Sequence, residues 1–243
     1  MRTTIISLLL LAGLCAAASG GPDNGGYYWF DQGEGAAFFS ENWTDISGGG
    51  SLISAGWGDD DFGFAGGLGW TFRYYGETYT DIYVSENGAV VFENTNPEYF
   101  RCAHDDHFPD EHTVDTILAP FWSDLNISDG GAVYYQDFGD RFVVMWDGID
   151  YWGHGECTFE LICWRTPDGD NSDIAFLYDF TPHDDWHVVG LQGDAATGTE
   201  LQYMPDDGDF VQPGDWYLLT PDADYFGGSN VVPTSWGRIK ALD

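Results

Sequence analysis

Apolar residues recur along most of the chain in short runs in which hydrophobic and polar positions alternate. Alternation with a period of two predicts strands with one buried face, whereas the 3.6-residue pattern of a helix is nearly absent before the end of the chain. The predicted strands cover residues 68–76, 80–87, 89–93, 116–122, 132–138, 140–149, 157–165, 172–180, 186–193 and 215–220. The sequence therefore predicts an all-β fold.

Clusters of turn-forming residues separate these runs. The pair Asn87-Gly88 lies between two alternating runs, which is the strongest short-range signal of a hairpin. Many short strands joined by such turns favour an antiparallel β-sandwich. We expect this sandwich, in a jelly-roll-like arrangement, to form one domain over residues 21–220.

The run at 140–149 is apolar on both of its faces. Phe142, Val144 and Trp146 lie on one face, and Val143 and Met145 lie on the other. A strand that is covered on both sides needs such a pattern. We therefore expect this strand to lie in the centre of a sheet with other residues packed over its outer face.

The beginning of the chain has the pattern of a removable export signal. Arg2 is followed by an apolar run over residues 5–14 and then by the small residues Ala16–Ala18. A positive start, a short apolar run and small residues before the cleavage point are typical of secretory signals. We therefore assign residues 1–20 to a signal peptide and expect a secreted, extracellular or cell-surface protein.

The mature chain is expected to begin near Ser19 or Gly21. The apolar run of the signal is too short for a membrane helix, which takes about 20 apolar residues, so no membrane span is expected. The alternative is a lipoprotein signal in which Cys15 is lipidated. Leu14 argues against it, because that processing requires a small residue before the cysteine.

Residues 221–243 form a tail of different composition. Pro233 is followed by Thr234 and Ser235, either of which can cap a short helix. The apolar face of this predicted amphipathic helix consists of Trp236, Ile239 and Leu242. Because about two turns of helix are not stable alone, the helix would dock on the domain or on a partner, or remain loose.

The charge balance limits the class of partner. The chain has 41 acidic residues against seven basic ones, for a net charge of −34. Nucleic acid is excluded as a partner, since a polyphosphate requires a basic surface. Self-repulsion of this size weakens a fold and is offset by cations, so saline surroundings or bound divalent ions are expected.

Calcium is the cofactor that the acidic clusters favour, because this hard cation binds several oxygen ligands from a tight loop. The alternative is that each cluster is an acidic turn exposed to solvent. No organic cofactor is expected. The candidate calcium ligands are Asp59, Asp60 and Asp61 in one cluster and Asp168, Asp170 and Asp173 in a second.

Histidines form two further clusters, in which His104 and His107 precede His112, and His183 precedes His187. Imidazole together with carboxylate suits zinc or copper. The spacing matches no known set of ligands, however, and acidic loops often carry histidine for solubility. A transition-metal site is therefore the weaker alternative to calcium.

Three cysteines follow the signal. Cys157 and Cys163 lie six residues apart in one predicted strand, which separates them by about 20 Å and prevents them from pairing. Cys102 therefore takes one of them if a bridge forms. We expect a disulfide between Cys102 and Cys157, because Cys157 begins its strand and is easier to reach from a loop. Cys163 alternates in phase with apolar neighbours and should be a buried thiol.

The usual signatures of hydrolases are absent from the sequence, including G-x-S-x-G, H-E-x-x-H and the P-loop. We therefore expect no catalytic residues. Two alternatives remain open. One is a hydrolase whose carboxylate pair is assembled by folding, and the other is a carbohydrate-binding protein in which aromatic rings stack on sugars. The candidate rings are Tyr151, Trp152 and Trp186.

Several segments resemble a module of bacterial secreted and surface proteins, and the middle and end of the chain are similar to the extracellular β domain named for nidogen. They include GPDNGGYYWFDQGEG, LGWTFRYYGETYTDIYVSENGAVVF, TILAPFWSDLN and VGLQGDAATGTELQY, and the resemblance covers roughly residues 22–220. It implies a non-enzymatic extracellular module in adhesion or cell-surface structure. Its partner would be an extracellular protein or glycan surface, and self-association would use sheet edges or the tail.

Overall fold

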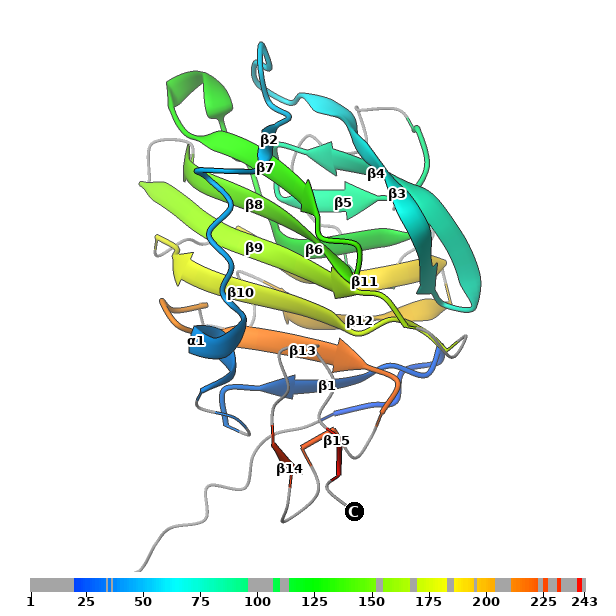
Figure 1. Ribbon diagram of the computed structural model, residues 1–243. Helices are drawn as coiled ribbons and strands as arrows, with labels where there is room; N and C mark the ends of the chain where they lie inside the picture. Colours follow the sequence, from blue (N-terminus) through cyan, green and yellow to red (C-terminus); the bar gives the residue numbers. More distant parts are fainter. Residues whose placement is uncertain are drawn as a thin grey trace, which may run out of the picture.

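The computed structural model describes residues 20–33, 35, 37–95, 107–109, 114–151, 155–166, 170–182, 186–194, 196–203, 211–222, 225–226, 231–232 and 240–241. Most of these residues belong to two antiparallel sheets that pack face to face (Figure 1). The predicted antiparallel β-sandwich is therefore confirmed. No helix in this part of the chain has the length and apolar character that crossing a membrane requires.

The larger sheet, sheet A, has the strand order β1-β13-β10-β9-β8-β7-β2. Its strands are β1 (Tyr28–Asp31), β13 (Trp216–Thr220), β10 (Ile174–Phe180), β9 (Glu156–Trp164), β8 (Arg141–Asp150), β7 (Ala132–Asp137) and β2 (Ser51–Leu52). The smaller sheet, sheet B, has the order β12-β11-β6-β5-β4-β3. Its strands are β12 (Thr197–Tyr203), β11 (Val188–Asp194), β6 (Ile117–Trp122), β5 (Ala89–Val91), β4 (Glu77–Ser85) and β3 (Phe62–Tyr74).

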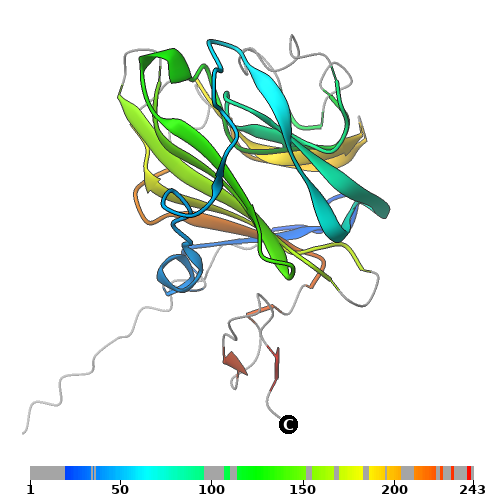
Figure 2. The same cartoon turned by 45° about the horizontal axis from the view of Figure 1, so that its top comes forward.

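Successive strands stay within one sheet for long stretches. The strands β3 to β6 form a meander in sheet B, and β7 to β10 form a second meander in sheet A. The predicted jelly-roll-like arrangement would have successive strands alternate between the sheets, so the strand order differs from that part of the prediction. Figure 2 shows the two layers side by side, with the second meander facing the first. Within each meander, consecutive turns therefore lie alternately at the two ends of the sandwich.

The central strand β8 is covered on both faces, as its sequence predicts. Phe142, Val144 and Trp146 are buried between the two sheets. Val143 and Met145 face the other way and belong to a second buried cluster on the outside of sheet A. Each face of β8 therefore removes apolar surface from water, which is the main favourable term in folding.

The outer face of sheet A is covered by the short helix α1 (Phe38–Asn42), which lies beside β13 in Figure 1. The ring of Phe38 packs on Trp216 with 4.5 Å between their centroids. Phe226, which follows β13 in the chain, packs on the same tryptophan at 5.8 Å. Aromatic contacts at these distances anchor α1 on the sheet.

Two short strands lie in the tail. β14 (Val231–Val232) pairs antiparallel with β15 (Lys240–Ala241). The predicted amphipathic helix includes Lys240 and Ala241, so at these residues the helix prediction is wrong. Instead, the backbone of Lys240 and Ala241 pairs with that of Val232 and Val231, which precede the predicted helix. The remaining residues of that helix lie outside the described part of the chain.

Cys157 and Cys163 both lie on β9 with their side chains fully buried between the sheets. The strand between them keeps them apart, as expected, and Cys163 is a buried free thiol. Burial raises the pKa of the Cys163 thiol well above its usual value, which makes this group unreactive. Cys102 lies outside the described residues, so its bridge to Cys157 stays a prediction.

Peptide mapping tests this bridge. Digestion of the unreduced protein should release a peptide that contains Cys102 linked to one that contains Cys157. Alkylation before denaturation should leave Cys163 unmodified, because its side chain is fully buried. A link between Cys102 and Cys163, or labelling of all three thiols without reduction, would contradict the assignment.

Candidate metal centre

Several connections of sheet B meet at one end of the sandwich. In the antiparallel register Phe62 at the start of β3 faces Ser85 at the end of β4, and Ser85 faces Ala89 at the start of β5. The end of β6 lies at the same end, because Val90 pairs with Leu118 and β6 then runs on past the turn before β5. Residues 57–61, 86–88 and 123–125 are therefore brought together by the meander itself.

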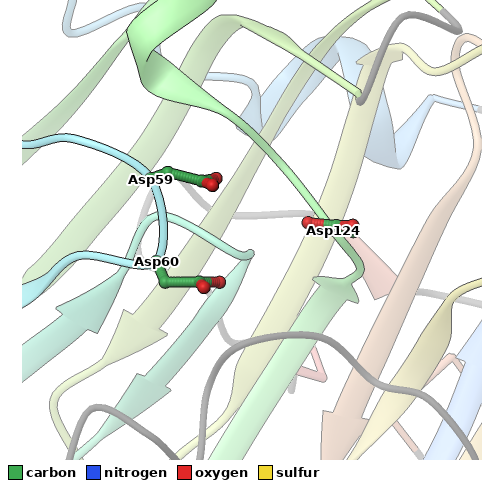
Figure 3. Close-up of side chains that lie close together, drawn as sticks. All are labelled: Asp59, Asp60 and Asp124. Atoms are coloured by element: carbon green, nitrogen blue, oxygen red, sulfur yellow. The ribbon is translucent and has the colours of Figure 1, made fainter.

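Three carboxylates face one another across these connections. Single oxygen atoms of Asp59, Asp60 and Asp124 all lie within 4.8 Å of one another. In Figure 3, Asp59 and Asp60 come from the loop before β3, and their carboxylates point toward Asp124, which follows β6. Asp59 is exposed, whereas Asp60 and Asp124 are half-buried. Oxygen ligands from two separate loops suit a hard cation such as Ca²⁺.

Asn87 joins the two sides of this cluster. Its side chain is fully buried, and its Nδ2 donates to Asp60 Oδ1 at 3.1 Å. Its Oδ1 accepts the backbone N–H of Leu125 at 2.7 Å, and its carbonyl oxygen accepts that of Ser123 at 3.1 Å. One buried residue therefore fixes the distance between the loop of Asp60 and the segment of Asp124.

Glu86 adds a fourth carboxylate behind the loop. It is fully buried, and its Oε1 accepts the backbone N–H of Asp60. Its Oε2 has no hydrogen-bond partner among the described residues. Burial raises the pKa of Glu86 to about 8, helped by the charges of Asp59, Asp60 and Asp61 and opposed by the bond from Asp60.

Trp186 borders the same end of the sheet. Its carbonyl oxygen accepts the Ser123 hydroxyl at 2.6 Å, one residue before Asp124. Its side chain is 44% exposed. The next residue, His187, is buried and stacks on Phe121 with 4.7 Å between the ring centroids. The main chain of Trp186 therefore lies beside the segment that carries Asp124.

Comparison with known proteins places this fold in a family. Residues 36–203 match the model of the family described as NIDO related. The chain belongs to the NIDO-related family. No curated protein and no solved structure matches it. The matched region runs from just before α1 to the end of β12 and includes Asp59, Asp60 and Asp124. The resemblance to the nidogen-type domain is thereby confirmed, and the chain is a module of the extracellular type.

Within this NIDO-related module, the first predicted aspartate cluster is divided. Asp59 and Asp60 face Asp124, as described above. Asp61 has another role, because its Oδ2 accepts the backbone N–H of Gly58 and closes the turn that carries its two neighbours. Asp61 therefore shapes the loop, and Asp124 takes the third position in the cluster.

The second predicted cluster contains Asp168, which lies outside the described residues. Asp170 is exposed. Asp173 is buried, and its Oδ1 accepts the hydroxyl of Thr220 at 2.6 Å. This contact ties the start of β10 to the end of β13, so Asp173 serves the packing of sheet A. Calcium binding by this second cluster stays a prediction.

Two of the three predicted sugar-stacking residues, Tyr151 and Trp186, lie in the described part of the module. Tyr151 is only 4% exposed and packs in the core between the sheets, so its ring cannot stack on a ligand in solution. Trp152 lies outside the described residues. Trp186 is the one of the three whose ring is both described and exposed.

The two described histidines have different surroundings. His107 Nδ1 lies 3.0 Å from Glu200 Oε2 near the surface. His187 packs on Phe121. His104, His112 and His183 lie outside the described residues, so the transition-metal alternative stays untested.

Proposed function

We propose that this NIDO-related module is a secreted, non-enzymatic binding module that acts in cell-surface or matrix adhesion. The observation that supports it best is the family match over residues 36–203, which spans the greater part of both sheets. The apolar run and small residues at the beginning of the chain add the expectation of export.

The burial of two acidic groups supports a non-enzymatic role. Glu86 and Glu160 each have a pKa raised to about 8, mainly because burial penalises the charged form. Such values suit general acid–base catalysis near neutral pH. Both side chains are fully buried, however, so neither can reach a substrate in the folded protein. Their pKa values follow from packing within the sandwich.

Aromatic residues on the outer face of sheet B, of which Phe64 is exposed and Phe62 and Tyr83 are half-buried, offer a binding surface. Phe64 on β3 is 55% exposed, and its ring lies 5.3 Å from that of Tyr83 on β4. Phe62 stacks on Tyr83 at 5.8 Å. We define the aromatic surface as Phe62, Phe64 and Tyr83. Aromatic residues contribute much of the energy of protein interfaces, so this surface is where the module would contact its partner.

Binding of a glycan is the second candidate function, and Trp186 is the observation that favours it. A sugar ring can stack on an exposed indole while neighbouring carboxylates accept its hydroxyl groups. Trp186 is exposed and lies next to the segment that carries Asp124. In this alternative the ligand would bind at the end of sheet B and not on the aromatic surface.

Binding to intact producing cells or extracellular matrix tests the proposal. The purified protein should bind with saturation, and Phe64→Ser should weaken binding about tenfold or more, since an interface aromatic contributes roughly 1–3 kcal/mol. Leu52→Ser is the matched control, because Leu52 is 51% exposed but lies on β2 of sheet A. Loss of binding in Trp186→Ala alone would favour the glycan alternative. Turnover of a polysaccharide or peptide would contradict a non-enzymatic role.

A further inference from the structure

We propose that the module binds a basic, extended peptide segment of a partner protein as an added strand beside β4. The binding place is a cavity of about 440 Å³ in sheet B, lined by residues 77–81 of β4 and by Phe92 and Glu93. This volume lies within the range of roughly 300–1,000 Å³ that is usual for ligand pockets. We call this place the β4 cavity. It shares no residue with the aromatic surface, so the inference goes beyond the adhesive role and does not depend on it.

The β4 cavity lies where sheet B lacks a strand. β5 lies between β4 and β6, and it ends at Val91, which pairs with Tyr83 on one side and with Ile117 on the other. β4 begins at Glu77, so its first residues extend beyond the end of β5. In the described part of the chain, residues 77–81 pair with β3 and with no other strand. One edge of β4 is therefore without a partner strand at the cavity.

The spacing of the strands leaves room for one strand beside this edge. Where β5 lies between them, β4 and β6 are two strand spacings apart, or roughly 10 Å. After Val91 the chain bends and leaves the line of β5. A peptide added there would continue that line and pair its backbone N–H and C=O groups with those of β4, which is how extended peptides bind to sheet edges. Residues 77, 78, 80 and 81 are exposed, so this part of β4 is accessible to a partner.

An aromatic pair forms the inner wall of the β4 cavity. Phe92 is 4% exposed and belongs to the core between the sheets. Tyr79 is half-buried and stacks on Phe92 with 4.9 Å between the ring centroids. Because side chains alternate along a strand, one face of the added peptide would meet these rings while the other faces water. The wall therefore favours apolar side chains at every second position of the peptide.

Charge selects the class of partner. Glu77, Asp81 and Glu93 line the cavity and are exposed, and none of the lining residues is basic. Burial raises the pKa of Tyr79 to about 12. The charges of Glu93, Glu77 and Asp115 also contribute to this rise, so several carboxylates act on one group at the cavity. Arginine or lysine side chains of the peptide would pair with these carboxylates through charge-assisted hydrogen bonds. A second copy of this chain is disfavoured as the occupant, because each copy has a net charge of −34.

Fluorescence anisotropy with a labelled peptide tests the cavity. The probe is a short peptide in which arginine and valine alternate, with fluorescein at one end. It is titrated with the full chain in roughly 0.15 M NaCl, where exposed charges more than about 8 Å apart are largely screened. We expect saturable binding of one peptide per chain. The same peptide with every backbone nitrogen methylated keeps its charges but lacks the donors of an added strand, so it should bind at least about tenfold more weakly.

Two double variants make the same change of charge at different places. Asp81→Asn with Glu93→Gln removes two carboxylates of the cavity and should weaken binding about fivefold or more. Asp129→Asn with Glu156→Gln is the matched control, because both residues are exposed and neither lines the cavity. It should bind the peptide like the wild type. All four side chains are exposed, so both double variants keep the fold.

Equal binding of the two peptides, an equal loss in the two double variants, or the absence of saturable binding would overturn the proposal. Self-association of the chain that the double variant of Asp81 and Glu93 abolishes would also overturn it, because the cavity would then belong to a second copy. Phe64→Ser, which tests the aromatic surface, should bind the peptide like the wild type. Failure of this proposal and failure of the adhesive proposal can therefore be told apart.

Discussion

Replacing Gly88 by alanine should lower the free energy of unfolding by at least about 3 kcal/mol. Gly88 lies in the turn between β4 and β5 with φ of +81°, a backbone conformation that residues with a Cβ rarely adopt. A Cβ at this position would also overlap the main-chain oxygen of Phe121 on the neighbouring strand β6. Since that oxygen belongs to the sheet backbone, the sheet itself would have to move.

Gly76→Ala separates the two causes. Gly76 has the same φ of +81°, but a Cβ there would have no atom within 4 Å. Its substitution should therefore cost only the backbone term, about 1–2 kcal/mol. Urea unfolding of both variants measures the difference. Equal losses of unfolding free energy would show that the contact with Phe121 has no effect.

Glu160 should make the stability of the domain fall as the pH rises. It lies on β9, fully buried, and its Oε1 accepts the backbone N–H of Thr44 at 3.0 Å. Its Oε2 has no hydrogen-bond partner in the described part of the chain. Burial raises the pKa of Glu160 to about 8, against the opposing effects of the Thr44 bond and of Arg141.

The sign follows from where the proton is held. Between pH 4.5, the ordinary value for a glutamate, and about pH 8, the folded state keeps the proton on Glu160 and the unfolded state has lost it. The contribution of Glu160 to stability is therefore complete below pH 4.5 and is lost as the pH rises through 8. The slope is roughly 1.4 kcal/mol per pH unit within this window.

Glu160→Gln removes this dependence and keeps an acceptor for Thr44. The unfolding free energy of the wild type minus that of the variant should decrease steadily from pH 5 to pH 8, as measured by urea unfolding at each pH. Glu156→Gln is the control, because Glu156 lies on the same strand but is exposed. A difference between wild type and Glu160→Gln that does not change with pH would contradict the prediction.

The sequence predicts most strands because each has one face in the core between the sheets. Two of the strands that it misses or shortens have an interrupted or polar pattern. β3 begins at Phe62, six residues before the predicted start, because glycines replace the apolar positions of its first half. β12 is a mostly polar edge strand that is held by backbone hydrogen bonds to β11. Its side chains therefore show no clear alternation from which the strand could be predicted.

The residues of the candidate metal centre, too, can be predicted only in part from the sequence. Asp59 and Asp60 can be predicted, since adjacent aspartates in a turn offer oxygen ligands together. Asp124 cannot be singled out, because only the order of strands in sheet B brings the end of β6 to the start of β3. The one available signal was the hairpin turn at Asn87-Gly88, which places the ends of its neighbouring strands at one end of the sheet.

The pairing of β1 with β13 has a consequence for the order of folding. Tyr28 lies opposite Thr220, so the strand at one edge of sheet A is completed by residues nearly two hundred positions later in the chain. Contacts between such distant residues form late, because a long loop must close first. A chain that emerges from a ribosome or a translocation channel in sequence order can build the β3–β6 and β7–β10 meanders as they appear. Its first strand has no partner until the segment around Trp216–Thr220 has also emerged. Complete folding therefore requires synthesis of the whole sandwich, and until β13 has paired, the side of β10 on which β13 lies in sheet A stays unpaired.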